Sequence, residues 1–309
     1  MATAVIFVIL ARRVHIGDVI PHDDPEALAF IGAALVFTLI GVVGSAFRWQ
    51  RVLATLDVHS GLFGLSRLYL ASLFVGNFLP STVGGDVVRV SRLAAETGRS
   101  PEAFASVVLE RLTGWIVLPA LTFTGLALNP PFRRYGSATA LAAGTAVLTL
   151  VALGTVLFIA GHPEVGRRLE DKEGWRRFIG AVHTGVDRFR RRPAQSLGVL
   201  AAGVGYQLSV MVSVFLLVKA LDLPVGFTGV LAFFPAVAIL QALPLTIGGL
   251  GVREGALYLF LRPMGVAAEQ AVALGVLFYG LNLVISLLGA PAFAAGARTP
   301  VELDAPVGT

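Results

Sequence analysis

The sequence contains no cysteine and few charged residues. Of its 309 residues only 14% are charged and 56% are hydrophobic, whereas soluble domains carry about 25% charged residues. The lack of cysteine excludes disulfides, thiolate chemistry and metal sites built from cysteine. The lack of charge excludes an ordinary soluble fold, because such a chain would expose a strongly apolar surface. We therefore expect an integral membrane protein.

The sequence also lacks the usual signatures of catalysis and cofactor binding. Its five histidines are scattered without the spacing of metal ligands. We find no Walker loop, dinucleotide fingerprint or Ser-His-Asp arrangement. The net charge of +5 lies in segments between apolar runs, where it reports topology. We expect no metal, no cofactor and no nucleic-acid partner.

Long apolar runs are able to cross about 30 Å of hydrocarbon. The clear runs are residues 27–47, 104–128, 136–160, 194–220 and 268–294. A shorter run at 2–11 is consistent with a tilted first helix. We therefore expect an all-α polytopic membrane protein with about six to eight transmembrane helices. Residues 1–296 would form a single membrane domain, followed by a short tail at 297–309.

Basic residues suggest how the chain is oriented in the membrane. The first clear run ends at Arg48-Trp49-Gln50-Arg51, which we interpret as a cytoplasmic anchor of two arginines and an interfacial aromatic residue. The most polar stretch, residues 161–193, contains nine lysines and arginines. By the positive-inside rule we expect it to be a cytoplasmic loop.

A short motif occurs twice. Residues 79–89 read LPSTVGGDVVR, and residues 243–253 read LPLTIGGLGVR. Proline and paired glycines interrupt a helix, and inside a membrane such breaks are tolerated only where the backbone is buried in protein or lines a wet cavity. We therefore predict two broken-helix motifs, at 62–103 and 227–262. Equivalent breaks in two halves of a chain are typical of a transport site.

The positions of the apolar runs suggest how the two motifs are related. If the segments at 48–51 and 161–193 both face the cytoplasm, residues 62–83 must enter and leave on that side. Three crossings then separate the two motifs. We therefore expect two re-entrant hairpins related as inverted repeats. This assignment leaves Arg133 and Arg134 outside, against the rule.

The repeated glycines and arginines indicate a binding site for a lipid phosphate. A Gly-Gly step lets backbone N–H groups approach an anion, and an arginine about one turn later is able to bind phosphate in a bidentate way. The predicted phosphate-binding residues are Gly84, Gly85, Arg89, Gly248, Gly249 and Arg253. The alternative is that the glycines allow close helix packing and the arginines mark the membrane interface.

Other polar residues near the motifs are candidates for headgroup or pathway contacts. They are Asn77, Thr82, Asp86, Glu110, Arg111, Thr246 and Glu254. Charges within a membrane helix usually face a bundle interior or a cavity. For Glu110 and Arg111, a pair reaching out to the membrane edge is an equally open alternative.

Four segments together resemble a known family. FRWQRVL (47–53), GNFLPSTVGGDVVR (76–89), VVLERLTGW (107–115) and LPLTIGGLGVREG (243–255) are similar to the transmembrane region of lysylphosphatidylglycerol synthases, also called the flippase-like domain family. Full-length members fuse this region to a soluble aminoacyl-transferase domain. These residues contain no counterpart of that domain, so we expect no lipid lysinylation by them.

The resemblance carries the family motif onto specific positions of this chain. These are Asn77, Pro80, Gly84, Gly85, Asp86, Arg89, Glu110, Arg111, Gly248, Gly249, Gly251, Arg253 and Glu254. It implies a protein of the plasma (inner) membrane that translocates or binds an anionic phospholipid or a polyprenyl-phosphate-linked lipid. We expect a transporter-like protein rather than an enzyme. Two alternatives stay open: an intramembrane transferase with a lipid-phosphate donor, and a scaffold for a cytoplasmic synthetase or glycosyltransferase.

Overall fold

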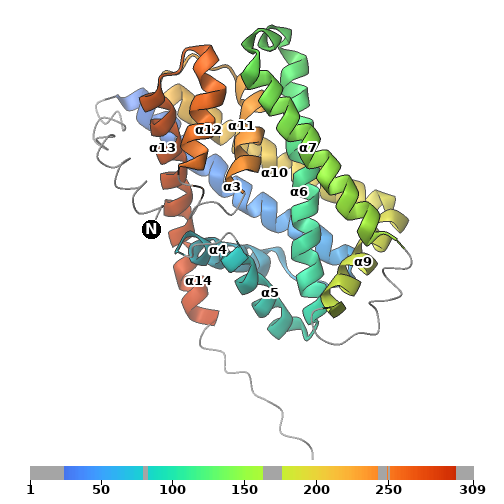
Figure 1. The fold of residues 1–309 in the computed structure, drawn as a ribbon. Coiled ribbons are helices and arrows are strands. Elements are labelled where there is room, and N and C mark those ends of the chain that lie inside the picture. Colours follow the sequence, from blue (N-terminus) through green and yellow to red (C-terminus); the bar gives the residue numbers. More distant parts are fainter. Residues whose placement is uncertain (1–23, 79–82, 163–175, 243–248, 250, 297–309) are drawn as a thin grey trace, which may run out of the picture.

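The described part of the chain is built from helices. The computed structural model describes residues 24–78, 83–162, 176–242, 249 and 251–296, and no strand occurs among them (Figure 1). The expected all-α fold is confirmed.

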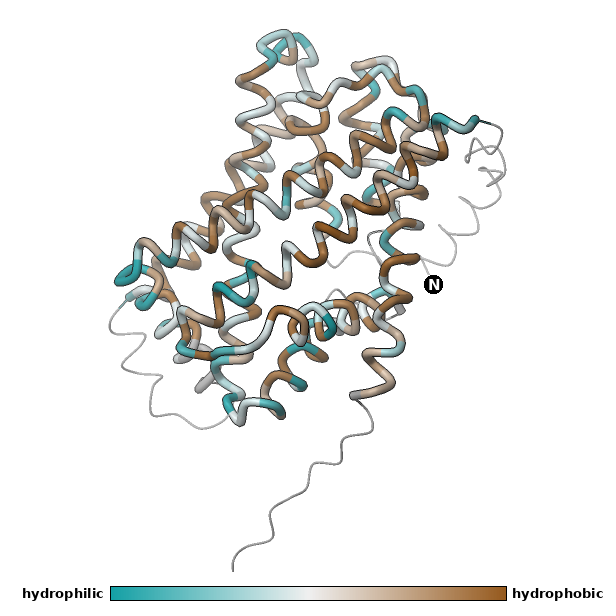
Figure 2. The backbone as a smooth tube through the Cα atoms, turned by 180° about the vertical axis from the view of Figure 1, so that it is seen from behind, coloured by the Kyte–Doolittle hydropathy of each residue, from teal (hydrophilic) through white to brown (hydrophobic). Residues whose placement is uncertain are grey.

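Five helices of the described residues are long and apolar enough to cross a membrane. They are α3 (Pro25–Thr55), α6 (Ser100–Leu128), α7 (Ser137–Ala160), α10 (Pro193–Ala220) and α13 (Ala268–Leu287), the last continued by α14 (Gly289–Gly296). Two short 3₁₀ helices, η1 (Pro130–Tyr135) and η3 (Arg262–Met264), follow α6 and α12. Figure 2 shows hydrophobic residues along most of the long helices and hydrophilic ones gathered near their ends. The chain is therefore a multi-pass membrane protein, and the short run at 2–11 lies outside the described residues.

Local sequence sets where several helices begin. The side chain of Asp24 accepts a hydrogen bond from the N–H of Glu26 at 2.9 Å, and prolines occupy the first turn of α3, α6 and α10. A proline there loses no intrahelical hydrogen bond. Helix α12 (Val252–Leu261) begins after Gly251, whose N–H donates to the Glu254 carboxylate at 2.6 Å. This contact satisfies a backbone donor ahead of the helix.

Each repeated motif folds as a helix, a break and a second helix. In the first motif α4 (Leu62–Phe78) is followed by α5 (Val83–Thr97), and in the second α11 (Phe227–Gln241) is followed by α12. The pair α4–α5 lies at one end of the bundle and the pair α11–α12 at the other (Figure 1). Residues 79–82 and 243–248 of the breaks lie outside the described residues. The inverted relation of the two hairpins stays a prediction.

The basic stretch contains an amphipathic helix, α9 (Arg176–Arg191), rather than a loop throughout. Arg188 and Arg192 bind the Asp57 carboxylate at 2.7 and 3.0 Å, and Arg99 donates to the Asp57 carbonyl at 2.9 Å. The hydrogen bond from Arg192 is the largest cause that lowers the pKa of Asp57. Because Asp57 follows α3 directly, the end of α3 and the basic stretch lie on the same side of the molecule. The positive-inside assignment requires this arrangement.

Two apolar cores pack the bundle. The first core is formed by α10, α11, α12 and α13 with parts of α6 and α7, and it contains the fully buried Phe233 and Phe260. The second core is formed by α3, α4, α5 and α6 with α9, and it contains the fully buried Trp49 and Leu53. Each core thus surrounds one of the broken-helix motifs.

Candidate functional site

A cavity of about 420 Å³ is lined by residues from both broken-helix motifs. Arg89 on α5 and Arg253 on α12 both line it, and they are only 4% and 3% exposed. The side walls come from α3, α4, α6, α10, α11 and α13. The two matching arginines, far apart in the sequence, therefore face one interior space.

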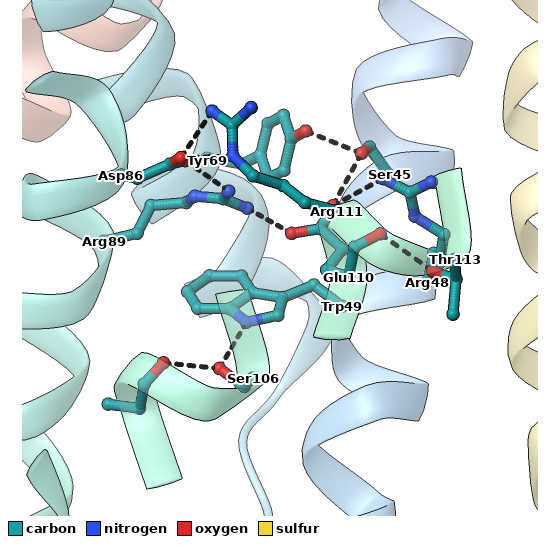
Figure 3. A network of polar contacts seen from close by, with 11 residues as sticks. Ser45, Arg48, Trp49, Tyr69, Asp86, Arg89, Ser106, Glu110, Arg111 and Thr113 are labelled. Atoms are coloured by element: carbon teal, nitrogen blue, oxygen red, sulfur yellow. Dashed lines mark hydrogen bonds and ion pairs between the residues drawn. The ribbon is translucent and has the colours of Figure 1, made fainter. Parts of the chain in front are cut away.

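Five charged side chains form a continuous series at this cavity (Figure 3). Arg48 Nη2 donates to Glu110 Oε1 at 2.8 Å, and Arg89 Nη1 donates to Glu110 Oε2 at 2.5 Å. Arg89 Nη2 also donates to Asp86 Oδ1 at 2.6 Å, while Arg111 Nε donates to Asp86 Oδ2 at 2.5 Å. We call this series, Arg48–Glu110–Arg89–Asp86–Arg111, the ion-pair chain. In it, every carboxylate is shared by two arginines.

Aromatic rings hold the arginines of the ion-pair chain in place. The guanidinium of Arg89 lies over the rings of Trp49 and Tyr69, 5.0 and 4.6 Å from their centroids. Arg48 lies over the ring of Tyr206 at 5.0 Å. A cation over a ring face is attracted to it, more strongly when both are removed from water. The rings therefore orient the guanidinium groups that Glu110 joins.

Hydroxyl groups complete the surroundings of Glu110. Ser45 Oγ donates to Glu110 Oε1 at 3.1 Å and also lies 2.7 Å from the hydroxyl of Tyr69. The indole N–H of Trp49 donates to Ser106 Oγ at 2.9 Å. Glu110 is only 1% exposed, and both of its carboxylate oxygens accept hydrogen bonds inside the helices. The interpretation of Glu110 as a group reaching the membrane edge is wrong.

The second motif contributes a separate ion pair. Arg253 Nη2 donates to Glu254 Oε1 at 2.5 Å, and the Arg253 guanidinium lies 5.2 Å from the centroid of the Tyr279 ring. Glu254 is buried but does not line the cavity. A Cβ added to Gly275 of α13 would lie 2.9 Å from Glu254 Oε1, so this glycine makes room for the carboxylate. Glu254 therefore positions Arg253 and does not itself face the cavity.

The glycine pairs behave differently in the two motifs. Gly84 and Gly85 belong to the first turn of α5, and a Cβ on Gly85 would lie 2.5 Å from the carbonyl oxygen of Ser72. Gly85 lines the cavity, yet it also allows α4 and α5 to pack closely. Gly249 instead has φ of +72°, and a Cβ there would lie 3.0 Å from Cβ of Gln241. A backbone with positive φ is therefore found at Gly249 but not at Gly84 or Gly85.

The remaining predicted residues divide into two groups. Asn77 and Arg111 line the cavity together with Asp86 and Glu110. Thr82, Thr246 and Gly248 lie outside the described residues. Asn282 of α13, which the motifs do not include, also lines the cavity and donates to the Phe278 carbonyl at 2.7 Å.

The sequence interpretation missed Arg48 and Trp49 as residues of the site. They are 5% and 0% exposed, so they are not a membrane-interface anchor. Helix α3 continues past them to Thr55. The signal was the helical spacing of Ser45, Arg48, Trp49 and Val52, because residues three and four apart share one face of a helix. All four are buried.

These features define a multi-pass helical membrane protein with an arginine-lined cavity between two broken-helix motifs. The family described as "Lysylphosphatidylglycerol synthase TM region" matches residues 1–289, and the chain belongs to this family. That membership connects it with the handling of membrane lipids. No match was found among curated proteins.

Proposed function

We propose that the chain is a lipid flippase-like protein of the plasma membrane. Its cavity would bind the phosphate of an anionic phospholipid or a polyprenyl-phosphate-linked lipid and pass the lipid between leaflets. One observation carries the proposal: buried arginines from both motif copies, Arg89 and Arg253, line a single cavity within the helical bundle. The basic stretch would face the cytoplasm.

The charge of the cavity supports an anionic ligand. Its lining contains four arginines, namely Arg48, Arg89, Arg111 and Arg253. A buried guanidinium is costly unless it is paired and hydrogen-bonded, and phosphate oxygens match its planar donors. The lipid tails would stay among the apolar faces of the long helices, whose exposed side chains are largely hydrophobic.

The geometry favours a carrier over an intramembrane transferase. Both oxygens of Glu110 and both of Asp86 accept hydrogen bonds from arginines. A carboxylate held in this way is a weak base, because taking up a proton would break these charge-assisted bonds. A general base of the transferase kind needs a carboxylate oxygen within reach of its substrate's proton.

A transport assay tests the proposal. The protein is reconstituted in vesicles of phosphatidylcholine with a trace of fluorescent phosphatidylglycerol, and movement between leaflets is followed by quenching from outside. We expect Arg89→Ala and Arg253→Ala to slow transport about tenfold or more, since a hydrogen bond to a charged group contributes about 1.5–3 kcal/mol. Arg67→Ala removes an exposed arginine of α4 that does not line the cavity, and it should transport like wild type.

Equal rates for wild type, Arg89→Ala and Arg253→Ala would remove these arginines from the mechanism and overturn the proposal. Size-exclusion elution and thermal unfolding in detergent would show that each variant is folded. Product formation from a labelled polyprenyl-phosphate donor would instead favour the transferase.

A further inference from the structure

Arg48 has more unused donor capacity than Arg89, of whose side-chain nitrogens only Nε has no hydrogen-bond partner. The side chain of Arg48 is 6% exposed and lines the cavity. One nitrogen, Nη2, binds Glu110, whereas Nε and Nη1 have no hydrogen-bond partner. Buried donors of a charged group are normally satisfied, and an unmet one calls for an explanation. Here the donors belong to a cation that lines the cavity.

The neighbours of Arg48 keep space around its guanidinium. A Cβ on Gly114 of α6 would lie 3.1 Å from Nη1, and a Cβ on Gly203 of α10 would lie 3.4 Å from Cδ of Arg48. Gly114 also lines the cavity. Two helices thus present glycine where a larger residue would press on this side chain, and neither supplies an acceptor for Nη1.

The ion-pair chain also carries one positive charge in excess. It contains three arginines and two carboxylates, so the formal charge of these five side chains is +1. Arg253 and Glu254 neutralise each other nearby. Residues 79–82 and 243–248, which link the helices of the two motifs, contain no ionisable side chain. Arg48 and Arg111 stand at the two ends of the chain, and each shares one carboxylate with Arg89. Arg48 is the buried end, with a side chain that is 6% exposed against 43% for Arg111.

We propose that Arg48 binds the lipid phosphate through its unpaired N–H groups, and that the cavity selects a phosphodiester headgroup with one net negative charge over a lipid diphosphate. This inference rests on the proposed function and narrows its substrate class. One negative charge neutralises the excess of the ion-pair chain. A diphosphate would leave at least one further negative charge buried without a partner, and such a charge is costly. A zwitterionic lipid would leave the excess positive charge in place.

A lipid-retention experiment tests this inference. The purified protein is equilibrated in nanodiscs with equal amounts of phosphatidylcholine, phosphatidylglycerol and a polyprenyl diphosphate, and retained lipid is measured by native mass spectrometry. We expect wild type to retain phosphatidylglycerol about tenfold or more over both competitors, the ratio that one charge-assisted hydrogen bond provides. Arg48→Gln should bring this preference close to one.

Two further variants separate charge from shape. Gly114→Ala keeps every charge but places a methyl group near Nη1, and it should weaken phosphatidylglycerol retention. Arg48→Lys keeps the charge, so it should still discriminate against the diphosphate while binding less lipid. Arg51→Gln, one turn along the same helix and exposed, is the matched control and should behave like wild type.

The outcomes distinguish this inference from the proposed function. If wild type prefers the diphosphate, or if folded Arg48→Gln keeps the wild-type preference, the inference is wrong while Arg89 and Arg253 still serve transport. If wild type retains no anionic lipid and Arg89→Ala transports normally, the proposed function itself is wrong.

Discussion

Glu110 is the residue on which the ion-pair chain depends, because its two oxygens bind two different buried arginines. Replacing it by glutamine would leave Arg89 paired with Asp86 and would leave Arg48 with no carboxylate partner among the described residues. Removing one partner of a buried ion pair costs about 3–5 kcal/mol. We expect Glu110→Gln to lower the free energy of unfolding by this amount, measured by denaturation in detergent.

The same helix provides a control for this prediction. Glu102 pairs with Arg99 at 2.8 Å, but both side chains are about one third exposed, at 31% and 38%. An exposed pair contributes at most about 1 kcal/mol. Glu102→Gln should therefore unfold almost like wild type, and equal losses for Glu102→Gln and Glu110→Gln would contradict a buried network.

The motif repeat predicted part of the site at the level of single residues. Arg89 and Arg253 were matched by sequence alone, and both line the cavity. Arg48 was missed because a charged residue at the end of an apolar run is usually interpreted as the point where the helix leaves the membrane. Whether a charged residue faces a cavity or the membrane surface depends on the helix face it occupies, which hydropathy averaged along the chain does not report.

At the level of elements, Gly125 controls how closely α6 approaches α11. A Cβ on Gly125 would lie 2.3 Å from the backbone nitrogen of Ala232, and backbone atoms have little freedom to move. We expect Gly125→Ala to lower the free energy of unfolding by about 1–3 kcal/mol through overpacking. Thermal unfolding in detergent would measure the loss.

Gly144 on α7 is the matched control for this contact. A Cβ there meets nothing within 4 Å, and alanine favours helix over glycine by up to about 1 kcal/mol. Gly144→Ala should therefore be neutral or slightly stabilising. A Gly125→Ala variant as stable as Gly144→Ala would contradict this close contact between α6 and α11.

Helix boundaries were predictable where apolar runs are long and both ends are marked. The run at 136–160 became α7 almost residue for residue, and 194–220 became α10. The end of α3 was not predicted, because its last two turns are amphipathic. One face is polar and the other is buried against the helical bundle, so the segment does not continue the apolar run. The helix α9 was missed for the same reason, since an amphipathic segment with many arginines has the composition of a loop.

At the level of the whole molecule, basic residues gather at both ends of the bundle, so orientation depends on their balance. The α9 end also carries Asp57 and His59, whereas the turn between α6 and α7 carries Arg133 and Arg134. The larger excess of arginine lies on the α9 side, and the positive-inside rule assigns that side to the cytoplasm. The chain has no cysteine, so a single introduced thiol reports one position without background.

We expect His59→Cys to react with a membrane-impermeant maleimide only in inside-out vesicles, and Ser137→Cys only in right-side-out vesicles. Both positions are exposed and lie beyond the ends of α3 and η1. The first motif enters and leaves on the same side, so the chain between these two positions crosses the membrane once, through α6. Labelling of both positions from the same side would contradict this single crossing. Reversed labelling would preserve the fold and invert only its orientation, and the basic stretch with α9 would then face outside.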